Sequence, residues 1–140
     1  MSKVAVVYWS GTGNTAAVAQ AVEQGAKDRG AEVTVFGPEE FTADKVSEFD
    51  AIAFGCPAMG AEVLEESSYE PMFTEIEGKL SGKKIALFGS YGWGDGQWMR
   101  DWEDRCNACG ARLAYDSVMA NNAPGESELD ECKSLGGALA

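Results

Sequence analysis

The sequence predicts one three-layer, doubly wound α/β domain, in which helices cover both faces of a five-stranded parallel sheet. Apolar runs and helical patterns alternate along the 140 residues, and right-handed crossovers between parallel strands turn that alternation into three layers. The apolar runs are continuous, which is typical of strands that are covered on both faces. Glycine-rich segments follow the first, third and fourth strands, at the sheet edge where such folds bind ligands.

The first half of the chain predicts three strands and one long helix. Apolar side chains at helical spacing, such as Val18 and Val22, predict a helix at residues 14–29 that stops at Gly30. The polar stretch 39–48 predicts a short helical turn. Apolar runs predict strands at residues 3–8, 32–36 and 51–55.

The second half repeats the alternation after a long connection. Apolar runs predict the fourth and fifth strands at residues 84–88 and 112–119. Helical patterns predict three more helices, at residues 72–80, 97–109 and 126–139. The whole chain, residues 1–140, is therefore expected to form a single domain of ordinary size.

Acidic residues dominate the charge, with 23 Asp and Glu against 11 Lys and Arg and a net charge of −12. Nucleic acid is a poor partner because phosphate contacts need Lys and Arg, whereas a protein with a basic surface is favoured. Residues 46–78 contain eight acids and no Lys or Arg, which predicts either a docking surface or a solvated face. No apolar run reaches about 18 residues and no signal peptide is evident, so a cytoplasmic protein is expected.

The absence of His excludes His-based nucleophiles and metal sites. The pair Cys106 and Cys109 has the spacing of a redox or zinc motif, but a zinc site would need two further ligands. We interpret the pair as small residues on a helix that ends near Gly110, and we expect no metal.

The segment between the first strand and the first helix offers neutral hydrogen-bond donors only. Backbone N–H groups converge at a helix N-terminus and the helix dipole favours an anion, so this turn is suited to a phosphate. It contains no Lys, Arg or acidic residue. Its sequence is Ser10-Gly11-Thr12-Gly13-Asn14-Thr15.

Two other nucleotide motifs fit this turn less well. A P-loop needs a Lys directly after its last glycine, but no Lys follows Gly13 until Lys27. Gly11, Gly13 and Ala16 do have the spacing of a dinucleotide fingerprint, yet the acidic residue expected after the second strand is poorly matched. A glycine-rich turn without a ligand remains the alternative for this segment taken alone.

The segments after the third and fourth strands contain exposed apolar side chains on flexible backbone. Met59 follows the third strand, and Tyr91 and Trp93 lie among the glycines that follow the fourth. Aromatic side chains on exposed loops lose burial energy unless something covers them. A flat ring between Met59 and Trp93 would cover both, so that the three segments together describe a mononucleotide site.

These three segments resemble those of the short-chain flavodoxins, in the same order and over essentially the whole chain. The matching residues are Tyr8 to Thr15, Ala58-Met59-Gly60 with Glu62 to Glu66, and Phe88 to Gly96. The resemblance implies the flavodoxin-like sheet order 2-1-3-4-5, a monomer, and noncovalent FMN that carries electrons between redox enzymes. It implies partners with basic docking surfaces, such as ferredoxin-type donors and acceptors.

The resemblance also implies the residues that hold FMN. The phosphate is expected at Ser10, Thr12, Asn14 and Thr15 with the amides of the same turn, and the ring between Met59 and Trp93. Glu62 is expected to accept a hydrogen bond from the ring, and Asn122 to touch its edge as in some members. The full expected set is Ser10, Gly11, Thr12, Gly13, Asn14, Thr15, Ala58, Met59, Gly60, Ala61, Glu62, Ser90, Tyr91, Gly92, Trp93, Gly94, Asp95 and Asn122.

The charges near the three segments predict a low reduction potential. Fully reduced FMN is an anion, and none of the three segments contains a Lys or Arg to balance it, whereas Glu62, Glu65, Glu66 and Asp95 add negative charge. The resemblance implies that the peptide bond at Gly60 turns its carbonyl group toward the ring when FMN is reduced. At the next position this chain has Ala61, where some relatives carry an acidic residue.

Two other functions fit the sequence less well. An FMN or quinone reductase that uses NAD(P)H would need room for a second substrate, which this short chain with Trp93 over the ring does not suggest. A response-regulator receiver domain would need an Asp after the third strand, where Gly55 and Cys56 stand, and is excluded.

Overall fold

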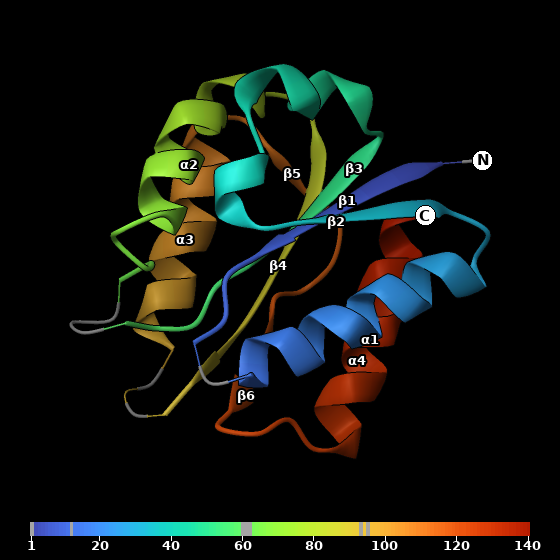
Figure 1. Ribbon diagram of the computed structural model, residues 1–140, viewed down its shortest axis with the longest axis vertical. Coiled ribbons are helices and arrows are strands. Elements are labelled where there is room, and N and C mark those ends of the chain that lie inside the picture. The colour runs from blue at the N-terminus through green and yellow to red at the C-terminus, as the bar shows by residue number, and fades with distance from the viewer. Residues whose placement is uncertain (1, 12, 60–62, 93, 95) are drawn as a thin grey trace.

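A computed structural model describes residues 2–11, 13–59, 63–92, 94 and 96–140, and it has the predicted three layers (Figure 1). Its parallel sheet has the order β2-β1-β3-β4-β5, as the resemblance implied. Helices α1 and α4 cover one face, and α2 and α3 cover the other (Figure 1). The strands are β1 (Lys3–Tyr8), β2 (Glu32–Phe36), β3 (Ala51–Gly55), β4 (Lys84–Tyr91), β5 (Arg112–Leu113) and β6 (Val118–Asn121). The helices are α1 (Asn14–Asp28), α2 (Tyr69–Ile76), α3 (Gln97–Ala108) and α4 (Glu126–Leu139), with 3-10 turns at Pro38–Glu40, Ala43–Glu48 and Glu77–Lys79.

Alternate side chains of each strand enter two separate cores. Val7, Phe54 and Leu87 face α2 and α3, in a core rich in aromatic rings. Val6 and Ala53 face α1 and α4, in a core of mostly small side chains. Because both faces are buried, the strands read as the continuous apolar runs on which the fold prediction was based.

Helices α1 and α4 pack closely because each contributes a glycine to the contact. A Cβ atom on Gly25 would lie 2.0 Å from the carbonyl oxygen of Lys133, and one on Gly136 would lie 2.0 Å from that of Val22. No side chain fits at such a distance, so the two backbones meet without side chains between them.

Three elements differ from the predicted ones. Strand β4 runs three residues further than expected, because Gly89, Ser90 and Tyr91 pair with β6. The predicted fifth strand is divided into β5 and β6, which both pair with β4 at its two ends. Helix α2 begins at Tyr69 rather than Met72, because a side chain outside the helix satisfies its first N–H groups, as described below.

The carboxyl ends of β1, β3 and β4 lie side by side at one edge of the sheet. The chain leaves β1 toward β2 on one side and later returns to β3 on the other, so this edge contains the switch point of the fold. Among the described residues, no helix is long and apolar enough to cross a membrane.

Candidate functional site

A cavity of about 230 Å³ lies at the carboxyl ends of β1, β3 and β4. It therefore occupies the place where a doubly wound fold is expected to bind a ligand. None of the described lining residues carries a charge. They are Trp9, Gly11, Asn14, Pro57, Ala58, Met59, Ser90, Tyr91, Gly92 and Asn122.

The turn before α1 is organised by the hydroxyl group of Ser10. Ser10 Oγ accepts hydrogen bonds from the N–H groups of Gly13 at 3.0 Å and Ala16 at 3.3 Å. With two bonds accepted, its O–H group remains free to donate to a ligand. Gly13 directly precedes the helix and has a φ of 97°, a backbone conformation that suits glycine. Because glycine has no side chain, Gly13 cannot cap the helix itself. Neutral donors thus gather at the positive end of the α1 dipole.

A buried pair of hydroxyl groups joins this turn to the sheet. Thr15 Oγ1, in the first turn of α1, lies 2.7 Å from Ser90 Oγ near the end of β4. Ser90 also accepts a hydrogen bond at its backbone oxygen from Ala58 N–H, at 3.0 Å. The segment expected at the phosphate and the two segments expected at the ring are therefore connected through one residue.

The segment after β3 is held by its own backbone and by α3. Met59 and Val63 exchange two backbone hydrogen bonds of 2.9 and 3.0 Å, which form an isolated antiparallel bridge. The indole N–H of Trp98 donates to Cys56 O at 3.2 Å, and Cys56 Sγ accepts from Glu65 N–H at 3.4 Å. Met59 reaches the cavity from a loop whose two ends are anchored.

Glu65 caps the N-terminus of α2 with its buried carboxylate. The carboxylate accepts hydrogen bonds of 2.8 to 2.9 Å from the N–H groups of Ser67, Ser68 and Tyr69 and from the Ser68 hydroxyl. Burial alone would raise the pKa of Glu65, but the bonds from Tyr69 and Ser68, with that from Ser67, outweigh burial and lower the pKa to about 2. The sequence predicts that Glu65 is one of the charges near the cofactor, and the structure gives it this structural role as well.

Asn122 and Tyr91 close the cavity on the side of β6. Asn122 has a φ of 60°, the single described non-glycine residue in the left-handed region, and its N–H donates to Tyr91 O at 2.7 Å. Asn is among the few residues that accept this conformation readily. The Tyr91 ring packs on Trp98 at 5.5 Å, so part of it is covered by the protein itself.

The structure brings most of the described expected residues together. Gly11, Asn14, Ala58, Met59, Ser90, Tyr91, Gly92 and Asn122 line the cavity. Ser10, Gly13, Thr15 and Gly94 are described but do not line it. Thr12, Gly60, Ala61, Glu62, Trp93 and Asp95, which were also expected at the site, lie outside the described residues.

Two residues of the cavity wall, Trp9 and Pro57, were missing from the expected set. Trp9 directly precedes the glycine-rich turn, and its ring would be 2.9 Å from a Cβ atom on Gly11. The sequence does carry this signal, since a large aromatic residue two positions before a required glycine can fold over it. In the sequence, Trp9 lies in the segment Tyr8 to Thr15 that carries the family resemblance, but nothing there assigns it to the cofactor site.

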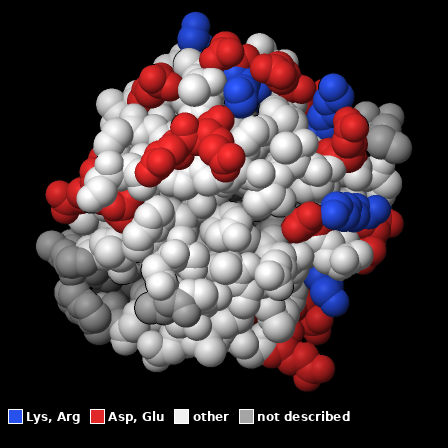
Figure 2. Space-filling view, in the orientation of Figure 1, with Lys and Arg blue, Asp and Glu red and all other residues white. Residues whose placement is uncertain are grey.

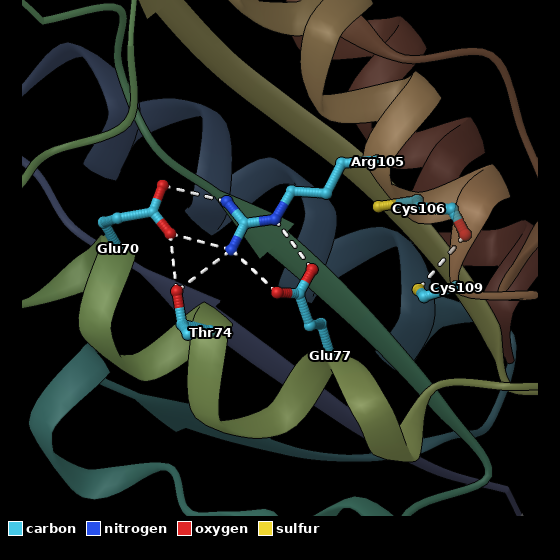
Figure 3. Close-up of polar contacts among 6 residues, drawn as sticks. All are labelled: Glu70, Thr74, Glu77, Arg105, Cys106 and Cys109. Atoms are coloured by element: carbon cyan, nitrogen blue, oxygen red, sulfur yellow. Dashed lines mark hydrogen bonds and ion pairs between the residues drawn. The ribbon is translucent and has the colours of Figure 1, made fainter.

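The acidic stretch 46–78 presents fewer free charges than its sequence suggests. Arg105 of α3 reaches Glu70 on α2 at 2.7 Å and Glu77 at 2.8 Å, and also donates to Thr74 (Figure 3). Burial would raise the pKa of Glu70, but hydrogen bonds from Arg105 and Thr74 lower it.

The cysteine pair lies at the end of α3. Cys106 is fully buried on this helix, and the thiol of Cys109, which directly follows the helix, donates to Cys106 O at 3.2 Å.

Basic side chains gather at the opposite edge of the sheet from the cavity. Lys3, Lys84 and Arg112 are the first residues of β1, β4 and β5. Figure 2 shows the basic side chains of the viewed face along its upper and right margins. The carboxyl edge, with its uncharged cavity, is thus separated from these cations by the length of the sheet.

Comparisons with known proteins agree with this geometry. A family model described as flavodoxin matches residues 6–136. The chain is 46% identical to the flavodoxin of Clostridium beijerinckii over 96% of this chain and 97% of that one. It is 48% identical to the flavodoxin of Megasphaera elsdenii over 98% of both chains. The solution structure of two-electron reduced Megasphaera elsdenii flavodoxin superposes with a TM-score of 0.90 at 47% identity, over 97% of both chains.

Proposed function

The chain belongs to the flavodoxin family, and from this premise we propose that the cavity at the carboxyl edge of its sheet binds FMN. As a flavodoxin the protein is an FMN-containing electron carrier rather than an enzyme, and it passes electrons between redox proteins. Residues 1–140 act as one FMN-binding domain in this proposal, since helices from the whole chain cover a single sheet.

The donor set at α1 fits the phosphate group of FMN. Ser10, Thr12, Asn14 and Thr15, with the amides of Gly11 and Gly13, would hold the phosphate without a cation. The supporting observation is the arrangement around Ser10, whose hydroxyl orders the turn and still has its own proton to donate. A helix N-terminus stabilises the phosphate charge that these neutral groups leave unbalanced.

The remaining expected residues would hold the flavin ring. Met59 and Trp93 would cover its two faces, and Ala58, the segment 60–62, the segment 90–92, Gly94, Asp95 and Asn122 would surround its edges. Met59 supports this assignment because it lines the cavity from an anchored loop, and its thioether makes favourable contacts with aromatic rings. When bound, FMN supplies a centre that takes up and releases electrons, one at a time in this proposal.

The uncharged wall of the cavity is the observation that supports a low reduction potential for bound FMN. No described residue in its wall is Lys or Arg, and the sequence places acidic residues around it. Negative charge added to a cofactor in such a place is stabilised less than in water, because water is excluded and no cation replaces it. The reduction potentials of bound FMN, compared with those of free FMN, measure this directly.

Binding itself is tested by titrating the apoprotein with FMN and following flavin fluorescence. We expect one FMN per chain, with fluorescence quenched because side chains cover the ring. Unchanged fluorescence and no retained flavin after gel filtration would contradict the proposed site.

We also propose a kind of partner, a cellular location and an oligomeric state for this protein. We infer that partners dock through basic surfaces, as ferredoxin-type donors and acceptors would, because exposed acids such as Glu66 and Asp101 lie on segments next to the cavity loops. We propose a cytoplasmic location, since Cys56, Cys106 and Cys132 are buried free thiols that suit a reducing compartment. The carrier is proposed to act as a monomer.

A further inference from the structure

The hydroxyl pair of Thr15 and Ser90 is buried and almost closed to solvent. Thr15 is 1% exposed and Ser90 is 4% exposed, and their oxygen atoms are 2.7 Å apart. Such a separation corresponds to a well-formed O–H···O hydrogen bond. The two residues lie 75 positions apart in the chain, so the bond forms only when α1 packs against the end of β4.

The pair has one more donor than it uses. Each hydroxyl carries one proton, and the bond between the two oxygens uses only one of the two protons. Within the described part of the chain, neither hydroxyl has another hydrogen-bond partner. A buried donor without an acceptor is costly, so this arrangement fits a ligand that brings an acceptor.

The location of Thr15 indicates which ligand group that acceptor belongs to. Thr15 is the second residue of α1, and helical side chains lean toward the N-terminus of their helix. The free proton is therefore best used by an acceptor at the N-terminus of α1, which is where an anion is stabilised.

Ser90 is held in place by contacts on three sides. Its backbone pairs with Ala120 of β6, its carbonyl oxygen accepts from Ala58 N–H, and its hydroxyl meets Thr15. A residue fixed in this way can set the direction of a neighbouring O–H bond with its side chain, in addition to lining the cavity.

We propose that Ser90 is a positioning residue for the phosphate group of bound FMN. Its hydroxyl donates to Thr15 Oγ1, and this bond turns the Thr15 proton toward a phosphate oxygen. Donation by Ser90 also polarises the Thr15 hydroxyl and strengthens the bond that it makes. The inference rests on the proposed FMN site, but it assigns to the Ser90 side chain a role that FMN binding alone does not require.

The test compares FMN with riboflavin, which has the same ring and ribityl chain but no phosphate. Apoproteins of the wild type and of Ser90→Ala are titrated with both ligands. We expect Ser90→Ala to weaken FMN binding about fivefold to tenfold, the usual effect of one hydrogen bond between uncharged groups, and to leave riboflavin binding unchanged. Ser117→Ala is the matched control, because it removes a hydroxyl that donates to Glu103 at 2.7 Å on another part of the molecule.

A double-mutant cycle tests the route through Thr15. Thr15→Val removes the hydroxyl with little change of shape, and in that background Ser90→Ala should cause no further loss of FMN affinity. Thr15→Ser, which keeps the hydroxyl, should retain most of the wild-type ratio between the two ligands.

Several outcomes would overturn the inference. Equal losses for FMN and riboflavin would mean that Ser90 supports the ring or the ribityl chain, and additive losses in the double variant would mean that the two hydroxyls act separately. An unchanged FMN affinity in Ser90→Ala would also reject the role. These results differ from a failure of the proposed site itself, in which the wild-type apoprotein would bind neither ligand.

Discussion

Single polar side chains order the loops around the cavity. Ser10 takes two backbone N–H groups of its turn, Glu65 takes those at the start of α2, and Asn122 turns the chain after β6. The side chains of Ser10 and Glu65 satisfy backbone N–H groups that would otherwise lack partners in a loop, and Asn122 supplies the left-handed conformation that the turn requires. The cavity is therefore formed by local hydrogen bonds as well as by the sheet beneath it.

Replacing Glu65 with Gln should destabilise the protein in a pH-dependent manner. The pKa of Glu65 is lowered from 4.5 to about 2, so the ionised carboxylate stabilises the fold by about 3 kcal/mol. This contribution is fully present above about pH 4.5 and is lost as the pH falls through about 2. Urea unfolding of the FMN-loaded proteins should show a difference at pH 7 that shrinks toward pH 2.

The neighbouring residue supplies the control for this experiment. Glu66 is exposed, and Glu66→Gln should change the stability by less than about 0.5 kcal/mol. A Glu65→Gln difference that stays constant from pH 7 to pH 2 would show that the carboxylate charge is not responsible.

For single residues, the sequence predicted which residue types surround the site but not which hydrogen bonds they make with one another. The cavity residues Met59, Tyr91 and Asn122 were expected, whereas the wall position of Trp9 was not. The cap formed by Glu65 and the hydrogen bond between Ser90 and Thr15 were also missed. The second bond depends on how α1 packs against β4, and one sequence without its fold contains no measure of that packing. The Glu65 cap is local, because its bonds reach only two to four residues along the chain, so the acidic residue before α2 was a signal that could have been read.

The helices are fixed to the sheet and to each other by contacts of different kinds on its two faces. On one face, α1 and α4 meet backbone to backbone at Gly25 and Gly136. On the other face, α2 and α3 are joined by the ion pairs of Arg105 (Figure 3). The Arg105 guanidinium also lies 4.9 Å from the centre of the Phe73 ring. The first contact depends on shape and the second on charge.

Adding one methyl group at the α1–α4 contact should be strongly destabilising. Gly25→Ala and Gly136→Ala would each place a Cβ atom 2.0 Å from a backbone carbonyl oxygen, so the helices would have to separate. We expect a loss of about 3 kcal/mol in the free energy of unfolding for each variant, measured by urea denaturation. Gly78→Ala is the control, because nothing lies within 4 Å of a Cβ atom there, and losses of equal size in all three variants would refute the packing argument.

Removing the charge of Arg105 should loosen the contact between α2 and α3. Arg105→Met would leave Glu70 and Glu77 without their cation, and since these groups are partly exposed we expect a loss of only about 1–2 kcal/mol. Lys27→Met breaks the more exposed pair with Glu23 and should cost less than about 0.5 kcal/mol. Equal thermal unfolding temperatures for the wild type and Arg105→Met would show that the ion pairs add nothing.

Element boundaries were predicted well where the pattern of the chain decides them. Strands β1, β2 and β3 and helix α4 have the predicted bounds, because apolar runs and glycine stops are local signals. The extension of β4 and the division of the fifth strand were not predicted. They arise because Gly89, Ser90 and Tyr91 find a partner in β6, about 30 residues away, and glycine-rich sequence by itself favours a loop.

Over the whole molecule, a charged edge and an uncharged cavity lie at opposite ends of the strands. The first residues of β1, β4 and β5 are basic, whereas the cavity at the opposite edge has no described charged residue in its wall. In a chain with a net charge of −12, this separation gives the molecule a preferred orientation toward a basic partner.

Reversing one charge at each edge tests this orientation. Glu66, before α2, lies toward the cavity edge, and Glu32, the first residue of β2, lies at the opposite edge. Glu66→Lys should slow electron transfer to cytochrome c, a basic acceptor, severalfold at low ionic strength, and high salt should remove the difference. Glu32→Lys carries the same change of net charge and should have a much smaller effect in stopped-flow measurements. Equal slowing by both variants would attribute the effect to net charge alone.

We propose that the uncharged cavity, which holds the phosphate by neutral donors and offers no cation to the ring, makes the bound FMN a low-potential electron carrier. A potentiometric titration of the FMN-loaded protein, followed by visible absorbance, measures the potentials of both electron steps. We predict two separate one-electron steps, with the second at a potential well below that of free FMN. A single two-electron step at the potential of free FMN would contradict it.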